Sequence, residues 1–83
     1  MTPQQVAQEV LALTMKVTVA GRRDELKAAF VEAGIMVSDD NATVNSVTEP
    51  AAGSYSKLMS NLAKFPVAKI AAKKAFASHK VIV

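Results

Sequence analysis

The amino-acid sequence predicts an all-α fold, a small helical domain of three to four helices. Apolar side chains recur every three or four residues in separate segments, and residues that favour helix starts and ends border those segments. Ala, the strongest helix former, supplies 15 of the 83 residues. A chain of this length is short for two independent cores, so we expect one domain over residues 1–83. The expected helices span about 3–19, 23–33, 55–65 and 67–78, with a long polar loop at 35–53.

The first helix is expected to have Thr2 as its N-cap and Pro3 at its first helical position. Gln5 completes a Thr-x-x-Gln capping box. Four aliphatic side chains share one narrow face of the helical wheel, with Leu11 at its margin, and we expect this face to meet the core. They are Val6, Val10, Leu13 and Val17.

The second helix follows Gly21, which marks a boundary because a glycine inside a helix costs about 1 kcal/mol relative to Ala. Asp24 and Glu25 suit the electropositive first turn of this helix. Gly34 stands where a C-terminal cap belongs. The apolar face between these signals comprises Leu26, Ala29, Phe30 and Ala33.

Turn formers dominate residues 35–53, which predicts the long loop. Val and Thr favour extended structure within it at 43–48, where a short strand, a helical turn and a loop all remain open. Ser54 is the expected N-cap of the third helix. The apolar face of that helix comprises Tyr55, Leu58, Met59, Leu62 and Phe65.

Pro66 divides the remaining sequence into two helices, because it lacks the N–H that an interior turn needs and disfavours helical dihedral angles at the preceding residue. On an unbroken helix three lysines would lie over the apolar face of the third helix: Lys69, Lys73 and Lys80. We therefore expect a fourth helix that aims its lysines separately. The apolar tail Val81–Val83 fits an edge strand, a contact with a neighbouring subunit or a plug of the core, and the plug is favoured.

Charge is distributed unevenly along the chain. Residues 1–53 carry four basic and seven acidic side chains, whereas residues 54–83 carry six lysines and no acid. Such asymmetry indicates an anionic partner or attraction between the two halves. Lysines neutralise phosphates without reading bases, so nucleic-acid binding here would be sequence-nonspecific. The candidates for contact with a polyanion or another partner are Lys57, Lys64, Lys69, Lys73, Lys74 and Lys80.

Catalytic and metal-binding patterns are scarce in the sequence. There is no Cys, the single His79 has no acidic neighbour in sequence, and the three glycines are too dispersed for a phosphate-binding loop. Residues 39–50 alternate like a calcium loop, but Val44 stands where Gly is needed and Pro50 where Glu is needed. We expect no catalytic residue, no metal, no cofactor and no small-molecule substrate, and a protein that is not an enzyme.

The segment RDELKAAFVEAGIMVSDDNAT, residues 23–43, resembles the first helix and extended loop of the helix-extended loop-helix modules in the SAP and LEM-like group. Asp-Glu-Leu opens the helix and Ala-Gly-Ile closes it, before Val-Ser and a polar turn. The resemblance implies binding to nucleic acid or to partner proteins. It covers about a quarter of the chain, and TVNSVTEP stands where the group's second helix begins, so it assigns no binding residue.

Composition and charge favour a non-enzymatic structural or assembly protein, a helical module that docks in a larger assembly, such as a virion or nucleoprotein particle. It would use subunit contacts and a lysine-rich face, because small Ala and Val side chains bury little area each and neighbouring subunits would add stability. The alternatives are a nonspecific nucleic-acid-binding protein and, less favoured, a protein bound at a membrane surface. No secretory signal or apolar run of about 18 residues is evident, so we expect an intracellular or in-particle location.

Overall fold

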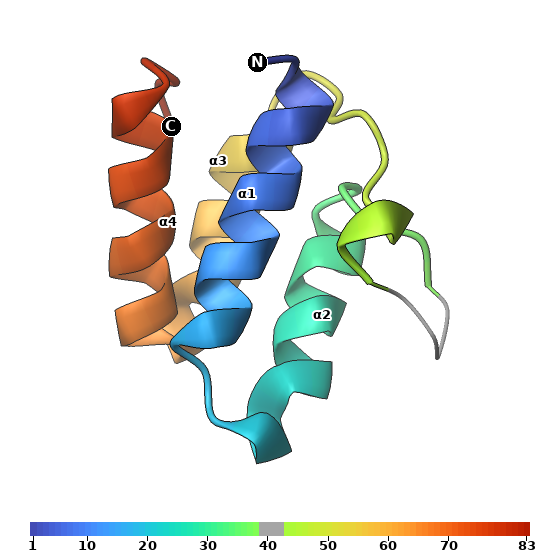
Figure 1. The fold of residues 1–83 in the computed structure, drawn as a ribbon, viewed down its shortest axis with the longest axis vertical. Coiled ribbons are helices and arrows are strands. Elements are labelled where there is room, and N and C mark those ends of the chain that lie inside the picture. Colours follow the sequence, from blue (N-terminus) through green and yellow to red (C-terminus); the bar gives the residue numbers. More distant parts are fainter. Residues whose placement is uncertain (39–42) are drawn as a thin grey trace.

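Four α-helices form the fold, in a computed structural model that describes residues 1–38 and 43–83 (Figure 1). They are α1 (Pro3–Lys16), α2 (Arg23–Glu32), α3 (Ser54–Asn61) and α4 (Pro66–Ser78). Three 3-10 turns connect or follow them: η1 (Ala20–Arg22), η2 (Val44–Ser46) and η3 (Leu62–Lys64). The described residues contain no β-strand, so the predicted all-α fold is confirmed.

The helices run alternately down and up the molecule, so that each is antiparallel to the next (Figure 1). α1 lies between α4 and α2 in this view, and α3 lies behind α1 and α4. The most extensive packing joins α1 to α4, and the next joins α2 to α3. No helix in the described ranges has the length and hydropathy of a membrane-spanning segment.

α1 begins as the sequence indicates but ends three residues early. The Thr2 Oγ1 accepts a hydrogen bond from the Gln5 N–H at 3.2 Å, and the Gln5 Oε1 accepts one from the Thr2 N–H at 2.8 Å. The helix stops at Lys16, not at residue 19. The next residues are β-branched Val17, Thr18 and Val19, which favour extended backbone over helix.

α2 ends at Glu32, one residue before the predicted end, and Gly34 caps it as predicted. Gly34 has a φ of +77°, which an L-residue adopts only at a cost. Its N–H donates to the Val31 carbonyl at 3.0 Å, and the Ile35 N–H donates to the Phe30 carbonyl at 3.1 Å. These two bonds form a Schellman cap, which satisfies carbonyls that the end of a helix leaves free.

α4 ends in the same hydrogen-bond pattern, with a lysine in the place of the glycine. Lys80 has a φ of +59°, and its N–H donates to the Ala77 carbonyl at 3.0 Å. The Val81 N–H donates to the Phe76 carbonyl at 2.8 Å, and Val81 is half-buried against the core. Ile82 is 97% exposed, so the tail plugs the core through Val81 alone.

The polar loop before α3 contains one 3-10 turn and one isolated β-bridge. Thr43 caps η2, and Val47 then forms an isolated antiparallel bridge with Met36, so residues 43–48 hold a helical turn followed by one paired residue. The Gln4 Nε2 ties this loop to α1 by donating to the Val47 carbonyl at 2.9 Å. The calcium-like pattern begins at residues 39–42, which lie outside the described residues.

α3 starts one residue earlier than predicted and ends at Asn61, not at residue 65, because the backbone tightens into the 3-10 turn η3 before Pro66. Gly53, with a φ of +83°, is its N-cap, whereas Ser54 is its first helical residue and makes no capping bond. Phe65 has non-helical dihedral angles (φ −129°, ψ 74°) between η3 and α4, and Pro66 begins α4. The predicted division into two helices is confirmed.

The core combines small and large apolar side chains from all four helices. Its largest fully buried members are Phe30, Phe76, Leu11, Leu26, Ile35, Leu58 and Leu62. Thr14 is also fully buried, and its hydroxyl donates to the Val10 carbonyl at 2.8 Å. Placing Leu13 and Val17 in the core was wrong: Ala7, Leu11 and Thr14 turn inward in their place, which leaves Leu13 38% and Val17 44% exposed.

Candidate interaction surfaces

The six candidate lysines do not gather on one face. On α4, Ala68, Ala72, Ala75 and Phe76 are buried, and this fixes the direction of every other side chain of the helix. Lys69 and Lys73 lie one turn apart on one flank. Lys74 follows Lys73 by about 100° around the helix, which places it on the flank that faces α1, where it lines a groove.

The other three candidates lie on separate parts of the surface. Lys57 is exposed on α3, Lys64 lines the groove between α2 and α3, and Lys80 terminates α4. No lysine forms an ion pair with a carboxylate of residues 1–38 or 43–83; in these ranges Arg22 forms an ion pair with Glu25, and Glu9 lies within hydrogen-bond distance of His79. The two halves of the chain are therefore not held together by lysine salt bridges within these ranges.

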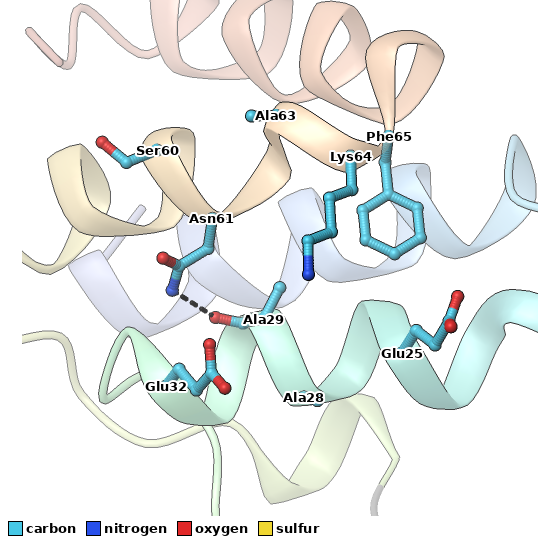
Figure 2. Close-up of a pocket in the computed structure, with 9 residues that line it drawn as sticks. All are labelled: Glu25, Ala28, Ala29, Glu32, Ser60, Asn61, Ala63, Lys64 and Phe65. Carbon is cyan, nitrogen blue, oxygen red and sulfur yellow. Dashed lines mark hydrogen bonds between the residues drawn. The ribbon is translucent and has the colours of Figure 1, made fainter.

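A cavity of about 410 Å³ lies between α2 and the α3–η3 segment, and we call it the α2–α3 groove (Figure 2). The Asn61 Nδ2 crosses it and donates to the Ala29 carbonyl at 3.1 Å. Glu25 and Glu32 stand at two points along its α2 wall, and the Lys64 side chain extends from the opposite wall toward α2. Acidic and basic groups therefore share this groove.

Arg22 lies beside the α2–α3 groove and contacts three of the residues that line it, Phe65, Glu25 and Lys64. Its guanidinium lies 4.4 Å from the centre of the Phe65 ring, a cation–π contact. Its Nε donates to the Glu25 carboxylate at 3.0 Å, and its Nη1 donates to the Lys64 carbonyl at 3.4 Å. One cation thus contacts both walls, whereas the Lys64 ammonium and the Glu32 carboxylate of the groove form no ion pair within the described ranges.

A second groove lies between α1 and α4, on the side away from α3, and we call it the α1–α4 groove. A hollow of about 330 Å³ is lined by Glu9 and Leu13 of α1 with Ala71 and Lys74 of α4. A separate hollow of about 150 Å³ lies one turn further toward η1, and its lining includes Val17, Val19, Arg22, Phe65, Pro66 and Val67. The α1 residues recur every fourth position and the α4 residues every third or fourth, so each set forms one ridge along the same side of its helix.

Exposed apolar side chains concentrate at the η1 end of this groove. Ten large apolar residues of the described ranges are exposed, and five of them belong to α1, α4 or the segment just after α1. They are Leu13, Val17, Val19, Val67 and Ile70. The remaining five are at the two termini or in the loop after α2.

The opposite end of the α1–α4 pair is fixed by two polar contacts. The His79 Nε2 and the Glu9 Oε2 lie 2.5 Å apart. The Tyr55 hydroxyl donates to the Pro3 carbonyl at 2.6 Å, its ring centre lies 4.7 Å from that of Phe76, and burial raises the Tyr55 pKa above its usual value. These contacts join α1, α3 and α4.

Sequence reasoning missed both the α1–α4 groove and the Glu9–His79 pair. The pair joins residues 70 positions apart, so local sequence carries no signal for it. The groove had a signal: the apolar arc of α1 runs from Leu13 to Leu11 over about 160° of the wheel, wider than one packing face. No group of three or more His, Asp or Glu in the described ranges has the arrangement of a metal site.

Comparisons with protein-family models, curated protein sequences and solved structures give no match for this chain.

Proposed function

We propose that this chain is a non-enzymatic structural or assembly protein, a helical module that docks in a larger assembly through subunit contacts and its lysine-bearing surface. One observation carries the proposal: α4 turns its larger aliphatic side chains outward. Val67 is 60% and Ile70 62% exposed, whereas the positions that α4 buries hold Phe76 and three alanines. A helix that serves only its own core would bury its Val and Ile first.

The lysines around these aliphatic side chains support contact with an anionic protein surface. Lys73 and Lys74 follow Ile70 by three and four positions, so they lie beside it on the outside of α4. Neither forms an ion pair within the described ranges. Apolar side chains with adjacent cations suit a protein partner, because the core of an interface excludes water and its rim carries the charges.

The polar groups of the α2–α3 groove support a binding role over catalysis. Catalytic acids and bases usually work in desolvated pockets that shift their pKa values. Glu25 and Glu32 are exposed, and Asn61 and Arg22 are engaged with backbone, ring or carboxylate partners across the groove. These contacts hold α2 and the α3–η3 segment together, and they leave the groove less suited to activating a substrate.

Site-specific photo-crosslinking in cells that carry the gene tests the proposal. The variant Ile70→benzoylphenylalanine should yield adducts of discrete mass that resist nuclease. The matched control Ser56→benzoylphenylalanine, at an exposed position of α3, should yield none. Equal yields from positions 70 and 56 would contradict an assembly role.

Nonspecific nucleic-acid binding is the second candidate, and Lys69 and Lys73, one turn apart and without a described carboxylate partner, favour it. With Lys74, three phosphate contacts would lower the affinity for duplex DNA about 40-fold between 50 and 200 mM salt. A titration at these two salt concentrations measures this. An affinity that does not change with salt would eliminate the candidate.

A further inference from the structure

We infer that the α1–α4 groove is the docking site for an acidic amphipathic helix of a partner subunit; this inference rests on the proposed assembly function and names the partner's chemistry. The shape, the apolar lining and the charges of the groove carry it.

The groove has the shape that receives a helix. Its walls are the α1 ridge (Glu9, Leu13, Val17) and the α4 ridge (Val67, Ala71, Lys74), which run antiparallel. α1 has 14 residues and is about 21 Å long, so a partner helix of about four turns would match it. Ridges of side chains on one helix pack into such grooves between others.

The lining of the groove is apolar and shallow. Leu13, Val17 and Val67 are 38%, 44% and 60% exposed and form its rim. Ala71 is the smallest member of the α4 ridge, and its short side chain would let a partner helix approach closely. α3 covers the rear of the α1–α4 pair, whereas no described element covers the front (Figure 1). A docked helix would therefore extend the packing that α3 makes on the other side.

The charges of the groove select an acidic partner. Lys74 lines one wall, and Lys16 lies one turn from Leu13 on the outer edge of the other; neither is paired with a described carboxylate. A third cation, Arg22, lines the η1 end and is paired with Glu25. Glu9, the acidic residue of this lining, is engaged by His79. A second copy of the chain in the same groove would bring lysines toward lysines, which opposes self-association. On a partner helix, acidic side chains on the two sides of an apolar seam would pair with Lys74 and Lys16.

The probe for this inference is a 14-residue helical peptide with a leucine seam flanked by glutamates. A matched peptide has the same leucines flanked by lysines. Chemical-shift mapping of the ¹⁵N-labelled chain should place the Glu-flanked peptide along residues 9–17 and 67–78, and the Lys-flanked peptide should bind at least 10-fold more weakly. Shifts confined to the α2–α3 groove, or equal affinity for the two peptides, would overturn the inference.

Variants of the chain locate the contact. Val67→Asp should lower the affinity for the Glu-flanked peptide at least 10-fold. Ile82→Asp should leave this affinity unchanged, because Ile82 lies outside the groove and is 97% exposed. Asp is well tolerated in the first turn of a helix, so Val67→Asp should stay folded, as circular dichroism would verify. Binding to phosphatidylglycerol vesicles without binding to the peptide would also overturn the inference, in favour of a lipid surface.

Failure of this inference is distinguishable from failure of the assembly role. The variant Leu13→benzoylphenylalanine places the crosslinker in the groove, whereas position 70 lies outside its lining. Adducts from position 70 without adducts from position 13 would refute the groove and retain the assembly. Adducts from neither position would refute both.

Discussion

The α2–α3 groove and the α1–α4 groove differ in how completely the chain satisfies them. In the first, Asn61 bonds across to the Ala29 carbonyl and Arg22 contacts both Phe65 and Glu25. In the second, Leu13 and Val67 face solvent, and Lys74 has no carboxylate partner in the described ranges. Asn61 and Arg22 bridge the walls of the first groove, while the second exposes the apolar and charged groups that a partner can use.

The largest effect should come from the buried side of α4. Phe76→Ala removes a fully buried ring that contacts Tyr55, and it should lower the free energy of unfolding by about 3–5 kcal/mol. Ile70→Ala, on the exposed side of the same helix, should change it by at most about 0.5 kcal/mol. Urea denaturation measures both, with Phe76→Leu as a milder variant. Comparable losses at positions 70 and 76 would show that the two sides of α4 are not distinct.

A smaller effect should follow from opening the α2–α3 groove. Asn61→Ala removes the hydrogen bond to the Ala29 carbonyl and should cost about 1 kcal/mol of unfolding free energy. Ser60→Ala, at an exposed neighbouring position of α3, is the matched control and should be neutral. Equal stability of the two variants in urea would mean that this bond does not hold the groove closed.

Stability should change in opposite directions when the residue with positive φ is substituted at the end of α4 (Lys80→Gly) and at the end of α2 (Gly34→Ala). Lys80→Gly relieves a strained φ and should stabilise the chain by about 0.5–1 kcal/mol, while Lys80→Ala removes the same charge without relieving the strain. Gly34→Ala should destabilise by a similar amount through its φ alone, because an added Cβ would approach only the Ser54 Oγ, at 3.9 Å. Thermal denaturation measures all three. A gain from Lys80→Ala equal to that from Lys80→Gly would assign the effect to charge.

The contact between Tyr55 and α1 should make stability fall at alkaline pH. Burial raises the Tyr55 pKa in the folded state. The folded state therefore favours the neutral phenol, and this contribution is fully present below the unfolded pKa and is lost as pH rises through the folded pKa. Tyr55→Phe has no phenol to ionise, so its free energy of unfolding should fall less between pH 8 and pH 11 than that of the unsubstituted chain. Denaturation at the two pH values measures this difference. An unchanged pH dependence in Tyr55→Phe would contradict the assignment.

The fold was predictable where the signals are local. The capping box at Thr2, the cap at Gly34 and the break at Pro66 each depend on residues within four positions, and all three are confirmed. The orientation of α1 was not predictable in the same way, because its apolar arc is wider than one face. The packing of α4, η2 and α2 against α1 goes with a buried Leu11 and an exposed Leu13.

The candidate surface was predictable in residue type but not in arrangement. The excess of lysines after residue 53 is plain from the sequence. Their distribution follows from the burial of Phe76 and the alanines of α4, which sends Lys73 and Lys74 to different flanks. The α1–α4 groove depends on packing between the first and the last helix of the chain, and helical periodicity within one segment carries no information about such packing.

The most direct measurement of the central claim compares cysteine accessibility in the free chain and in its native assembly. The chain has no cysteine, so the variants Val67→Cys and Ser56→Cys each carry one reactive thiol. The proposed docking predicts that a maleimide modifies both positions readily in the free chain, and that in the assembly position 67 is protected while position 56 still reacts. Equal reactivity of position 67 in the two states would contradict the assignment of this surface as a docking site.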